Sequence, residues 1–502
     1  MKRSPRVVIV GSGMSGLCMT WYLKNAGVED ITVLEKAADV GGTWRDNSYP
    51  GLACDVPSRF YQFRFAPNPD WSHLFSPGPE ILDYFRKVAD DHDLRRHIVF
   101  GVEATDLTWD TGVWRVATND GNVREADFVV TATGILHHPN IPDLPGMSDF
   151  QGPIFHSARW DHSVPIEGAR IGVVGSGSTG VQIVSALGGN ADQVVLFQRS
   201  PHWVVPVPNP GYPSLTRAAH RLLPVLDQLA YLGYRTAFER VSVALVQPGV
   251  RRTVVTRATK AGLRAVKDRK LRAAITPDFE PMCRRLIFSP DFYRAVQRAD
   301  VRVVTTPIDR FVADGIATDG EQVKLDAVVL ATGFDSHAFM RPTQVSGRDG
   351  LTIDQAWSDG PFAYHGVALP GFPNLFMAMG PHSPVGNYSL TAIAEAQAQH
   401  ITAWISRWAD DEFDTIEPRY EATRAHNAEM KAALPGTVWS TGCTSWYLGK
   451  DGTPELWPWS PEKYRHVLAR PRREDWETHK LLTATTTRAR VKSTPTPKMM
   501  EK

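Results

Sequence analysis

The stretch VVIVGSGMSG, Val7–Gly16, decides the fold of this chain. A β-branched run leads into Gly11-x-Gly13-x-x-Gly16 and then into an apolar helix-forming stretch, and Glu35 follows 24 positions after Gly11. This order predicts a βαβ unit whose glycines let a pyrophosphate approach the helix N-terminus. An acidic residue at the end of the second strand accepts a hydrogen bond from a ribose 2′-hydroxyl. Glu35 therefore favours a dinucleotide with free ribose hydroxyls, such as FAD.

The same pattern occurs a second time in IGVVGSGSTG, Ile171–Gly180. Gly175-x-Gly177-x-x-Gly180 again separates a β-branched run from a helix, but Arg199 now stands 24 positions after Gly175. An arginine cannot accept a hydrogen bond, although it can pair with a 2′-phosphate. This unit therefore favours NADPH. The alternative is two chance glycine turns in an ordinary α/β sheet, which the shared context and offset argue against.

Length and charge restrict the remaining classes. A chain of 502 residues is too long for one compact core, so two or three domains are expected. The net charge of +1 indicates neither nucleic acid nor an acidic membrane as a partner. No apolar run approaches the roughly 20 residues of a membrane span. The first strand follows Met1 so closely that we expect no signal peptide and predict a cytoplasmic protein.

The cysteines indicate neither a metal nor a redox centre. They are scattered and include no C-x-x-C pair, which argues against a dithiol redox centre and a zinc site. We therefore predict no metal, and a pyridine nucleotide–disulfide reductase is disfavoured. This usage is typical of a reducing cytosol. The four residues are Cys18, Cys54, Cys283 and Cys443.

Two strand patterns that end in Ala-Thr-Gly suggest how the domains connect. VVTATG at Val129–Gly134 closes the first unit, and VVLATG at Val328–Gly333 repeats it 199 residues later. We interpret the second copy as the return of the chain to its first domain after an insertion. The predicted fold is α/β, with two Rossmann-like domains for FAD and NADPH, the second inserted in the first, plus a helical subdomain. The predicted limits are 1–145 (FAD-binding domain, first part), 146–212 and 276–322 (NADP-binding domain), 213–275 (helical insert), and 323–482 (FAD-binding domain, second part, with the C-terminal segment).

Two segments differ from the rest in composition. Residues 213–275 are rich in Leu, Ala, Val and Arg at helical spacing, without a strand pattern. A solvated charged face explains their basic residues better than a partner-binding surface. Residues 483–502 are rich in Thr, Lys, Arg and Pro, which predicts a disordered tail. The basic residues of the insert include Arg251, Arg252, Lys260, Arg264, Lys267, Arg269, Lys270 and Arg272.

A longer pattern lies between the two glycine motifs and carries a family resemblance. FQGPIFHSARWD resembles the fingerprint of type I Baeyer–Villiger monooxygenases, F-x-G-x-x-x-H-x-x-x-W-(P/D), at every defined position. Two further segments resemble the same family: GGTW at 41–44 with YPG at 49–51 and Asp55, and the aromatic segment Trp439–Pro458. The fingerprint positions are Phe150, Gly152, His156, Trp160 and Asp161.

The resemblance implies oxidation of ketones to esters or lactones with NADPH and O₂, through a C4a-peroxyflavin and with sulfoxidation as a side activity. Arg285 would be the catalytic arginine that keeps the peroxide deprotonated, because a guanidinium stays charged at any working pH. Asp55 would orient that arginine. Arg284 would help Arg199 and Ser200 to hold the 2′-phosphate.

The resemblance also assigns residues near the flavin. Gly42, Thr43 and Trp44 would lie along FAD, whereas His156 and Trp160 would act in the hinge between the domains. The alternatives stay open: surface arginines at 284 and 285, a turn or N-cap role for Asp55, a core role for Trp44, and acid–base chemistry at His156.

Two other functions compete with the ketone reaction. One is an N- or S-hydroxylating flavin-containing monooxygenase, and the other is a flavin-binding protein without turnover. The expected partners are a small ketone and O₂, and not nucleic acid. No pattern specifies the ketone or an oligomeric state.

Overall fold

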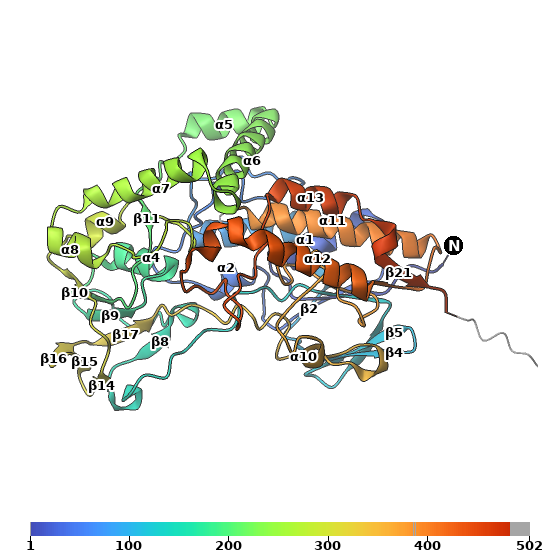
Figure 1. The fold of residues 1–502 in the computed structure, drawn as a ribbon, viewed down its shortest axis with the longest axis horizontal. Coiled ribbons are helices and arrows are strands. Elements are labelled where there is room, and N and C mark those ends of the chain that lie inside the picture. Colours follow the sequence, from blue (N-terminus) through green and yellow to red (C-terminus); the bar gives the residue numbers. More distant parts are fainter. Residues whose placement is uncertain (1, 385, 387, 482–502) are drawn as a thin grey trace, which may run out of the picture.

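The computed structural model describes residues 2–384, 386 and 388–481, so the predicted tail at 483–502 lies outside the described residues. Two parallel sheets, each with its own glycine-motif helix, form the body, and a group of helices stands out from it (Figure 1). The predicted α/β class with two Rossmann-like sheets is confirmed. Among the described residues, no helix has both the length and the apolar character needed to cross a bilayer.

The first sheet belongs to the first glycine motif. The glycine-motif strand and the two strands on one side of it are buried throughout, as expected for a parallel sheet covered on both faces. Helix α1 (Met14–Asn25) follows the motif and packs against α11 (Leu390–Ala409), and α3 (Gly78–Asp91) adds to this layer. The strand order is β19 (Leu375–Met377), β7 (Phe128–Thr131), β1 (Val7–Val10), β2 (Ile31–Glu35) and β3 (Ile98–Phe100).

The second sheet belongs to the second glycine motif and has the same arrangement around it. Helix α4 (Ser178–Leu187) follows that motif and packs against α9 (Phe292–Ala295). The strand order is β13 (Val301–Val304), β10 (Gln193–Phe197), β9 (Arg170–Val174), β17 (Ala327–Leu330) and β8 (Ile154–His156).

The prediction that the second Ala-Thr-Gly strand returns the chain to its first domain is wrong. β17 pairs with β9 and β8 in the second sheet, whereas β7, which carries the first copy, pairs with β1 in the first. Each copy is thus the strand beside its own glycine-motif strand. The repeat reflects the internal similarity of the two units, because the same glycine turn needs the same small neighbour. The predicted boundary at 322/323 therefore falls too early, since the chain leaves the second sheet only after β17.

The predicted helical insert consists of helices, without a regular strand between 213 and 275. A buried ion pair joins Arg59 of the first domain to Asp227, and His220 Nδ1 lies 2.9 Å from the same carboxylate. This pair anchors the insert, because two buried charges are stable only together. The helices are α5 (Ser214–Leu222), α6 (Val225–Val246), α7 (Val250–Gly262) and α8 (Arg269–Ala274).

A disulfide bond joins Cys283 to Cys443, with their Cα atoms 6.1 Å apart, while Cys18 and Cys54 are buried thiols. This bond was not expected from the sequence, in which the cysteines are scattered and their usage is typical of a reducing cytosol.

The remaining α-helices and strands are α2 (Thr43–Asp46), α10 (Ile353–Ala356), α12 (Tyr420–Ala433), α13 (Pro461–Ala469), β4 (Ala104–Asp110), β5 (Val113–Thr118), β6 (Val123–Ala126), β11 (Val204–Val205), β12 (Ile287–Phe288), β14 (Arg310–Val312), β15 (Gly315–Thr318), β16 (Glu321–Lys324), β18 (Gln344–Ser346), β20 (Thr415–Pro418) and β21 (Trp476–His479).

Candidate active site

The glycines of the first motif are required by close backbone packing. Gly11 has φ +103°, and a Cβ there would lie 2.7 Å from the carbonyl oxygen of Ala132. A Cβ on Gly16 would lie 1.9 Å from the carbonyl oxygen of Gly11. Gly13 is the N-cap of α1 and makes no side-chain cap, and the first turn holds no acidic residue. The free N–H groups of this helix end fit a pyrophosphate.

Glu35 lies beside that helix end and is buried. Its carboxylate accepts hydrogen bonds from the backbone N–H of Ser12 at 2.9 Å and from the Ser12 hydroxyl at 2.8 Å. The backbone N–H of Ala37 donates to the other oxygen, which also lies 3.1 Å from the Arg45 guanidinium. These donors hold the carboxylate in a fixed position at the end of β2, as recognition of a ribose requires.

The second motif repeats the glycine packing but is more open. A Cβ on Gly175, at φ +114°, would lie 2.4 Å from the carbonyl oxygen of Ala331, and one on Gly180 would lie 1.9 Å from that of Gly175. A Cβ on Gly177 would meet nothing within 4 Å. Gly177 is the N-cap of α4, again without a side-chain cap or an early acidic residue. This helix end fits a second pyrophosphate with more space around it.

Positive charge gathers next to this second motif. The Arg284 guanidinium donates to the Ser200 hydroxyl at 3.1 Å and lies over the Phe279 ring at 4.4 Å. Burial lowers the pKa of Arg284, and the charge of the exposed Arg199 lowers it further, although Asp278 opposes this. Two cations that disfavour each other beside a serine hydroxyl fit a 2′-phosphate, which would relieve their repulsion. Phe279 was missed by sequence reasoning.

Arg285 and Asp55 form a two-pronged ion pair although 230 positions separate them. Arg285 Nε donates to one carboxylate oxygen at 2.8 Å and its Nη2 to the other at 2.6 Å. The two side chains are only 22% and 16% exposed. Burial acts to lower the pKa of Arg285, but the charge and hydrogen bonds of Asp55 outweigh it, so the net pKa is raised. The structure thus brings together both predicted catalytic residues as a permanently charged, oriented guanidinium.

The GGTW–YPG segment lies at the junction of the two units. Trp44 is half-buried and its indole N–H donates to the Tyr61 hydroxyl at 3.1 Å, while Thr43 is exposed. Gly42 has φ +52°, and a Cβ there would lie 3.0 Å from the Cα of Gly13, so this segment covers the first motif.

The neighbouring YPG turn reaches the second unit. The Tyr49 hydroxyl donates to the side-chain oxygen of Gln182 at 2.8 Å, and the Gln182 amide donates to the carbonyl of Ala53 at 2.9 Å. A Cβ on Gly51 would lie 2.6 Å from the Gln182 carbonyl oxygen. Gln182 on α4 therefore couples the two units beside Asp55. No sequence pattern marked it, because its partners lie in another domain.

The fingerprint histidine holds the linker in place. Both ring nitrogens of the buried His156 are engaged: Nδ1 accepts from the backbone N–H of Ala158 at 3.1 Å, and Nε2 lies 3.0 Å from the carbonyl oxygen of Gly333. The accepting Nδ1 leaves the proton on Nε2, so the ring is neutral, and burial lowers the pKa of His156 accordingly. These contacts fit a structural or hinge role better than acid–base chemistry.

The other fingerprint residues also serve packing. A Cβ on Gly152 would lie 2.4 Å from the Asp326 carbonyl oxygen, and the ring of Phe150 packs against Phe311 with centroids 6.2 Å apart. Trp160 is buried edge-on to Phe155. Asp161 is a turn residue, because its carboxylate accepts from the backbone N–H and the hydroxyl of Ser163.

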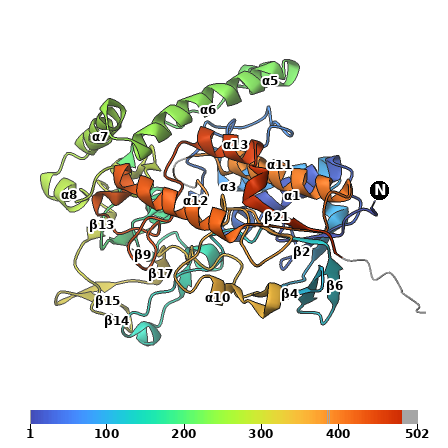
Figure 2. The ribbon, with the colours of Figure 1, turned by 45° about the vertical axis from the view of Figure 1, so that its right-hand side comes forward.

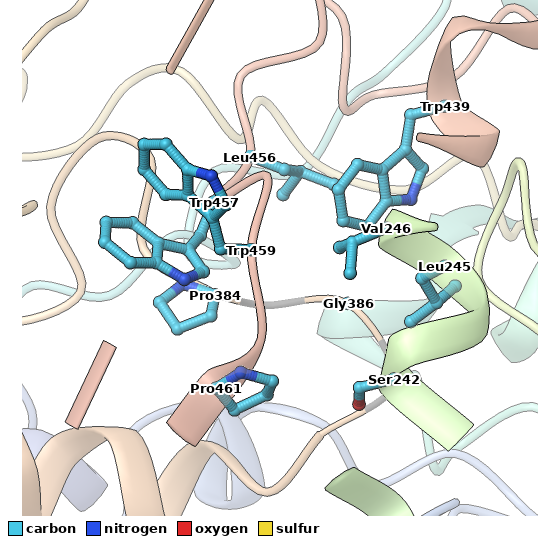
Figure 3. A pocket seen from close by; sticks show the side chains of 10 residues that line it. All are labelled: Ser242, Leu245, Val246, Pro384, Gly386, Trp439, Leu456, Trp457, Trp459 and Pro461. Atoms are coloured by element: carbon cyan, nitrogen blue, oxygen red, sulfur yellow. The ribbon is translucent and has the colours of Figure 1, made fainter. Parts of the chain in front are cut away.

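An apolar pocket lies where α6 meets the C-terminal aromatic segment. Trp457 and Trp459 face Trp439 and the last turn of α6 across this pocket (Figure 3). The Cys283–Cys443 bond joins the segment of Trp439 to the segment of Arg285. Cys443 is four residues after Trp439, and Cys283 is two residues before Arg285, so the bond links the wall of the pocket to the segment of the arginine. Its lining residues are Ser242, Leu245, Val246, Pro384, Gly386, Trp439, Leu456, Trp457, Trp459 and Pro461.

Comparisons with known proteins point to the same family as the sequence motifs. The family described as FMO-like, flavin-binding monooxygenase-like, matches residues 4–231. An uncharacterised monooxygenase of Mycobacterium tuberculosis is 54% identical, over 95% of this chain and 96% of its own length. A Baeyer–Villiger monooxygenase of Streptomyces coelicolor is 38% identical, over 93% of this chain and 91% of its own.

Solved structures agree with these relatives. Cyclohexanone monooxygenase from Rhodococcus sp. Phi1 bound to NADP⁺ has a TM-score of 0.85 at 27% identity, over 95% of this chain and 99% of that one. A steroid monooxygenase bound to NADP gives the same score and coverage at 29% identity. With the two dinucleotide units and the Arg285–Asp55 pair in place, this chain belongs to the FAD- and NADPH-dependent Baeyer–Villiger monooxygenases.

Proposed function

We propose that Arg285 and Asp55 are the catalytic residues with which this enzyme converts a ketone into an ester or lactone. The observation that carries this proposal is the buried fork between the two side chains. It fixes a guanidinium where the second unit, the first unit and the C-terminal segment meet. A cation held in a partly dry site stabilises negative charge that develops beside it, and this effect is much stronger than in water.

The two glycine units hold the cofactors in this proposal. Gly11, Gly13, Gly16 and Glu35 bind FAD, with Gly42, Thr43 and Trp44 beside it. The second set binds NADPH. Bound FAD supplies the activation of O₂ after NADPH has reduced it. The NADPH-binding residues are Gly175, Gly177, Gly180, Arg199, Ser200 and Arg284.

Asp55 orients Arg285 and keeps it charged, and it takes no part in proton transfer. A bidentate carboxylate fixes the plane of the guanidinium, and the raised pKa of Arg285 keeps it charged at every working pH. The fingerprint residues Phe150, Gly152, His156, Trp160 and Asp161 hold the linker between the units. Through that linker they govern how the NADPH unit moves relative to FAD.

The pocket beside α6 would hold the apolar part of the ketone. Three tryptophans and the aliphatic side chains of Leu245 and Val246 make its wall apolar. Such a wall binds hydrocarbon by excluding water, whereas the carbonyl end needs the cation. The substrate class is therefore an apolar ketone whose carbonyl reaches Arg285.

The test is product analysis with purified, FAD-loaded enzyme. Cyclic, linear and aryl ketones and one thioether are each incubated with NADPH and O₂, and products are separated by gas chromatography. We expect esters or lactones from at least one ketone. Arg285→Ala should lower ester formation about 10²- to 10³-fold, which is the usual effect of removing a preorganised charge stabiliser. Arg285→Lys should retain only part of the wild-type ester formation, because a lysine ammonium cannot form the two-pronged contact with Asp55.

A matched measurement separates catalysis from cofactor binding. Anaerobic bleaching of the flavin by NADPH should proceed at the wild-type rate in Arg285→Ala, because hydride delivery does not need the fork. Unchanged ester yield in that variant would refute the assignment of Arg285. Oxygenation of only the thioether by the wild type would favour the N/S-hydroxylating alternative, and failure of NADPH to bleach the flavin would favour a binding protein without turnover.

We also propose a cytoplasmic location, where NADPH is regenerated. The Cys283–Cys443 bond weighs against it, because disulfide bonds are rare in that compartment. However, both sulfurs lie in buried residues, out of reach of soluble thiols. Trapping free thiols during cell lysis would show whether the bond forms there.

A further inference from the structure

The helical insert concentrates positive charge that the rest of the chain lacks. Residues 213–275 contain 13 of the 55 Lys and Arg residues but only three of the 54 Asp and Glu residues. Their formal charge is therefore +10, against −9 for the remainder. Within the described residues, seven exposed basic side chains of the insert have no ion-pair partner. These are Arg240, Arg251, Arg257, Arg264, Lys267, Arg269 and Lys270.

The same insert also exposes most of the large apolar side chains that reach solvent. Of the 14 exposed large hydrophobic residues in the described chain, nine lie between 215 and 254. Leu222 is 79% exposed and Val250 is 80% exposed, which is unusual for aliphatic side chains gathered in one subdomain. The nine are Leu215, Leu222, Leu223, Val225, Leu229, Leu232, Val241, Val250 and Val254.

These apolar residues follow the helical repeat, so they form stripes rather than isolated positions. Val225, Leu229 and Leu232 are spaced by four and three residues along α6, and Leu222 precedes them at the end of α5. On α7, Val250 and Val254 are one turn apart, and Arg251 and Arg257 are exposed on the same helix. Apolar stripes flanked by basic side chains are typical of helices that lie on a membrane surface.

The position of the insert leaves this face open. α5 and the first half of α6 stand out beyond the body of the molecule, and no other element covers their outer side in either view (Figures 1 and 2). The inner side of the same segment is fixed to the body by the buried Arg59–Asp227 pair in the first turn of α6, with His220 of α5 beside it. An anchored, projecting helix can therefore meet a flat surface without displacing the rest of the fold.

We propose that the helical insert binds the surface of an anionic phospholipid bilayer, with its leucine stripe in the acyl boundary and its basic side chains on the headgroups. The +10 charge argues against a second copy on the same face, because two such surfaces would repel. A nucleic acid would meet the charge but leave the leucines exposed to water. A bilayer satisfies both, since apolar burial and headgroup attraction add.

The test is co-sedimentation of the full-length, FAD-loaded enzyme with vesicles. One set contains phosphatidylcholine alone, and the other contains phosphatidylcholine and phosphatidylglycerol in equal parts. We expect binding to the anionic vesicles at least about tenfold tighter than to the neutral ones, and weaker as salt is raised. Leu229→Ser combined with Leu232→Ser should weaken anionic binding at least about tenfold. Arg251→Gln combined with Arg257→Gln should reduce the salt dependence.

Matched controls keep the outcome decisive. Val123→Ser combined with Ile141→Ser removes two exposed apolar residues outside the insert and should leave vesicle binding unchanged. Each variant must keep its bound flavin and wild-type melting temperature. Absence of binding to anionic vesicles overturns the proposal. A doubling of mass that depends on the leucines and occurs without vesicle binding also overturns the proposal, because this face would then be a contact between copies. RNA binding that the leucine variant does not weaken overturns it as well.

Discussion

The two nucleotide-binding units are built alike up to the end of their second strands and differ beyond that point. In both, the first glycine has positive φ and lies against the alanine carbonyl of an Ala-Thr-Gly turn, and the third glycine lies against the first. Glu35 then ends one second strand as a buried carboxylate with several donors, whereas Arg199 follows the other as an exposed cation. The common part binds a pyrophosphate, and the differing part selects the nucleotide.

The surroundings of the two motifs also differ, because the first motif is enclosed and the second is open. Gly13 is covered by Gly42 of the GGTW segment, but nothing lies within 4 Å of the position that a Cβ on Gly177 would take. An enclosed site suits a cofactor that stays bound, while an open one suits a cofactor that exchanges in every turnover.

A disulfide bond joins the second unit to the C-terminal segment, and the first prediction removes this bond. Cys443→Ser should lower the free energy of unfolding by about 2–4 kcal/mol, because the unfolded chain regains the freedom of a long closed loop. Urea unfolding followed by tryptophan fluorescence measures this. Cys283→Ser should give the same loss, and the double variant no more than either. Additive losses would show that the two cysteines act separately.

The sequence predicted what is encoded locally and missed what depends on distant contacts. The glycine motifs, Glu35 and Arg199 lie within single βαβ units, whose order and spacing are visible in the chain. The Arg285–Asp55 fork was expected only from a family resemblance, since 230 positions separate its members.

The wrong and missed predictions also come from contacts between segments that are distant in the sequence. The strand β17 was misplaced because an Ala-Thr-Gly turn fits beside either motif, and only the observed pairing with β9 decides between them. The Cys283–Cys443 bond and the contacts of Gln182 were missed because each joins segments from different domains. Such contacts leave no periodic trace in the sequence.

The glycine packing gives the second prediction, which compares positions within the second unit. Gly180→Ala should cost about 1–3 kcal/mol of stability, because its Cβ would lie 1.9 Å from a backbone carbonyl that cannot easily move. Gly177→Ala should leave stability nearly unchanged, since its φ of −71° suits alanine and its surroundings are open. Instead it should raise KM for NADPH by narrowing the approach of the pyrophosphate. Thermal unfolding and steady-state kinetics separate the two effects, and equal destabilisation would contradict the open site.

Glu35 gives the third prediction, which concerns the enclosed unit. Glu35→Gln keeps the size but removes the charge, so a carboxylate that accepts from Ser12 and Ala37 loses charge-assisted bonds. FAD affinity should fall about 10- to 100-fold, as expected for hydrogen bonds to a charged group. Equilibrium titration of the stripped protein with FAD, followed by flavin fluorescence, measures this. KM for NADPH should stay unchanged once FAD is saturating, and a change there would mean that the two sites are not independent.

Arg199 gives the smallest expected effect, because it is exposed and shares its task with Arg284 and Ser200. Arg199→Ala should raise KM for NADPH about three- to fivefold, which is the value of one solvent-screened charge contact to a phosphate. KM for NADH should not change, because NADH lacks the phosphate. The control is Arg302→Ala, which removes an exposed arginine paired with Glu321 elsewhere in the domain and should affect neither cofactor. Equal effects of Arg199→Ala on both cofactors would assign it to the common part of the site, and the contrast with Glu35 would then no longer explain how the chain tells its two dinucleotides apart.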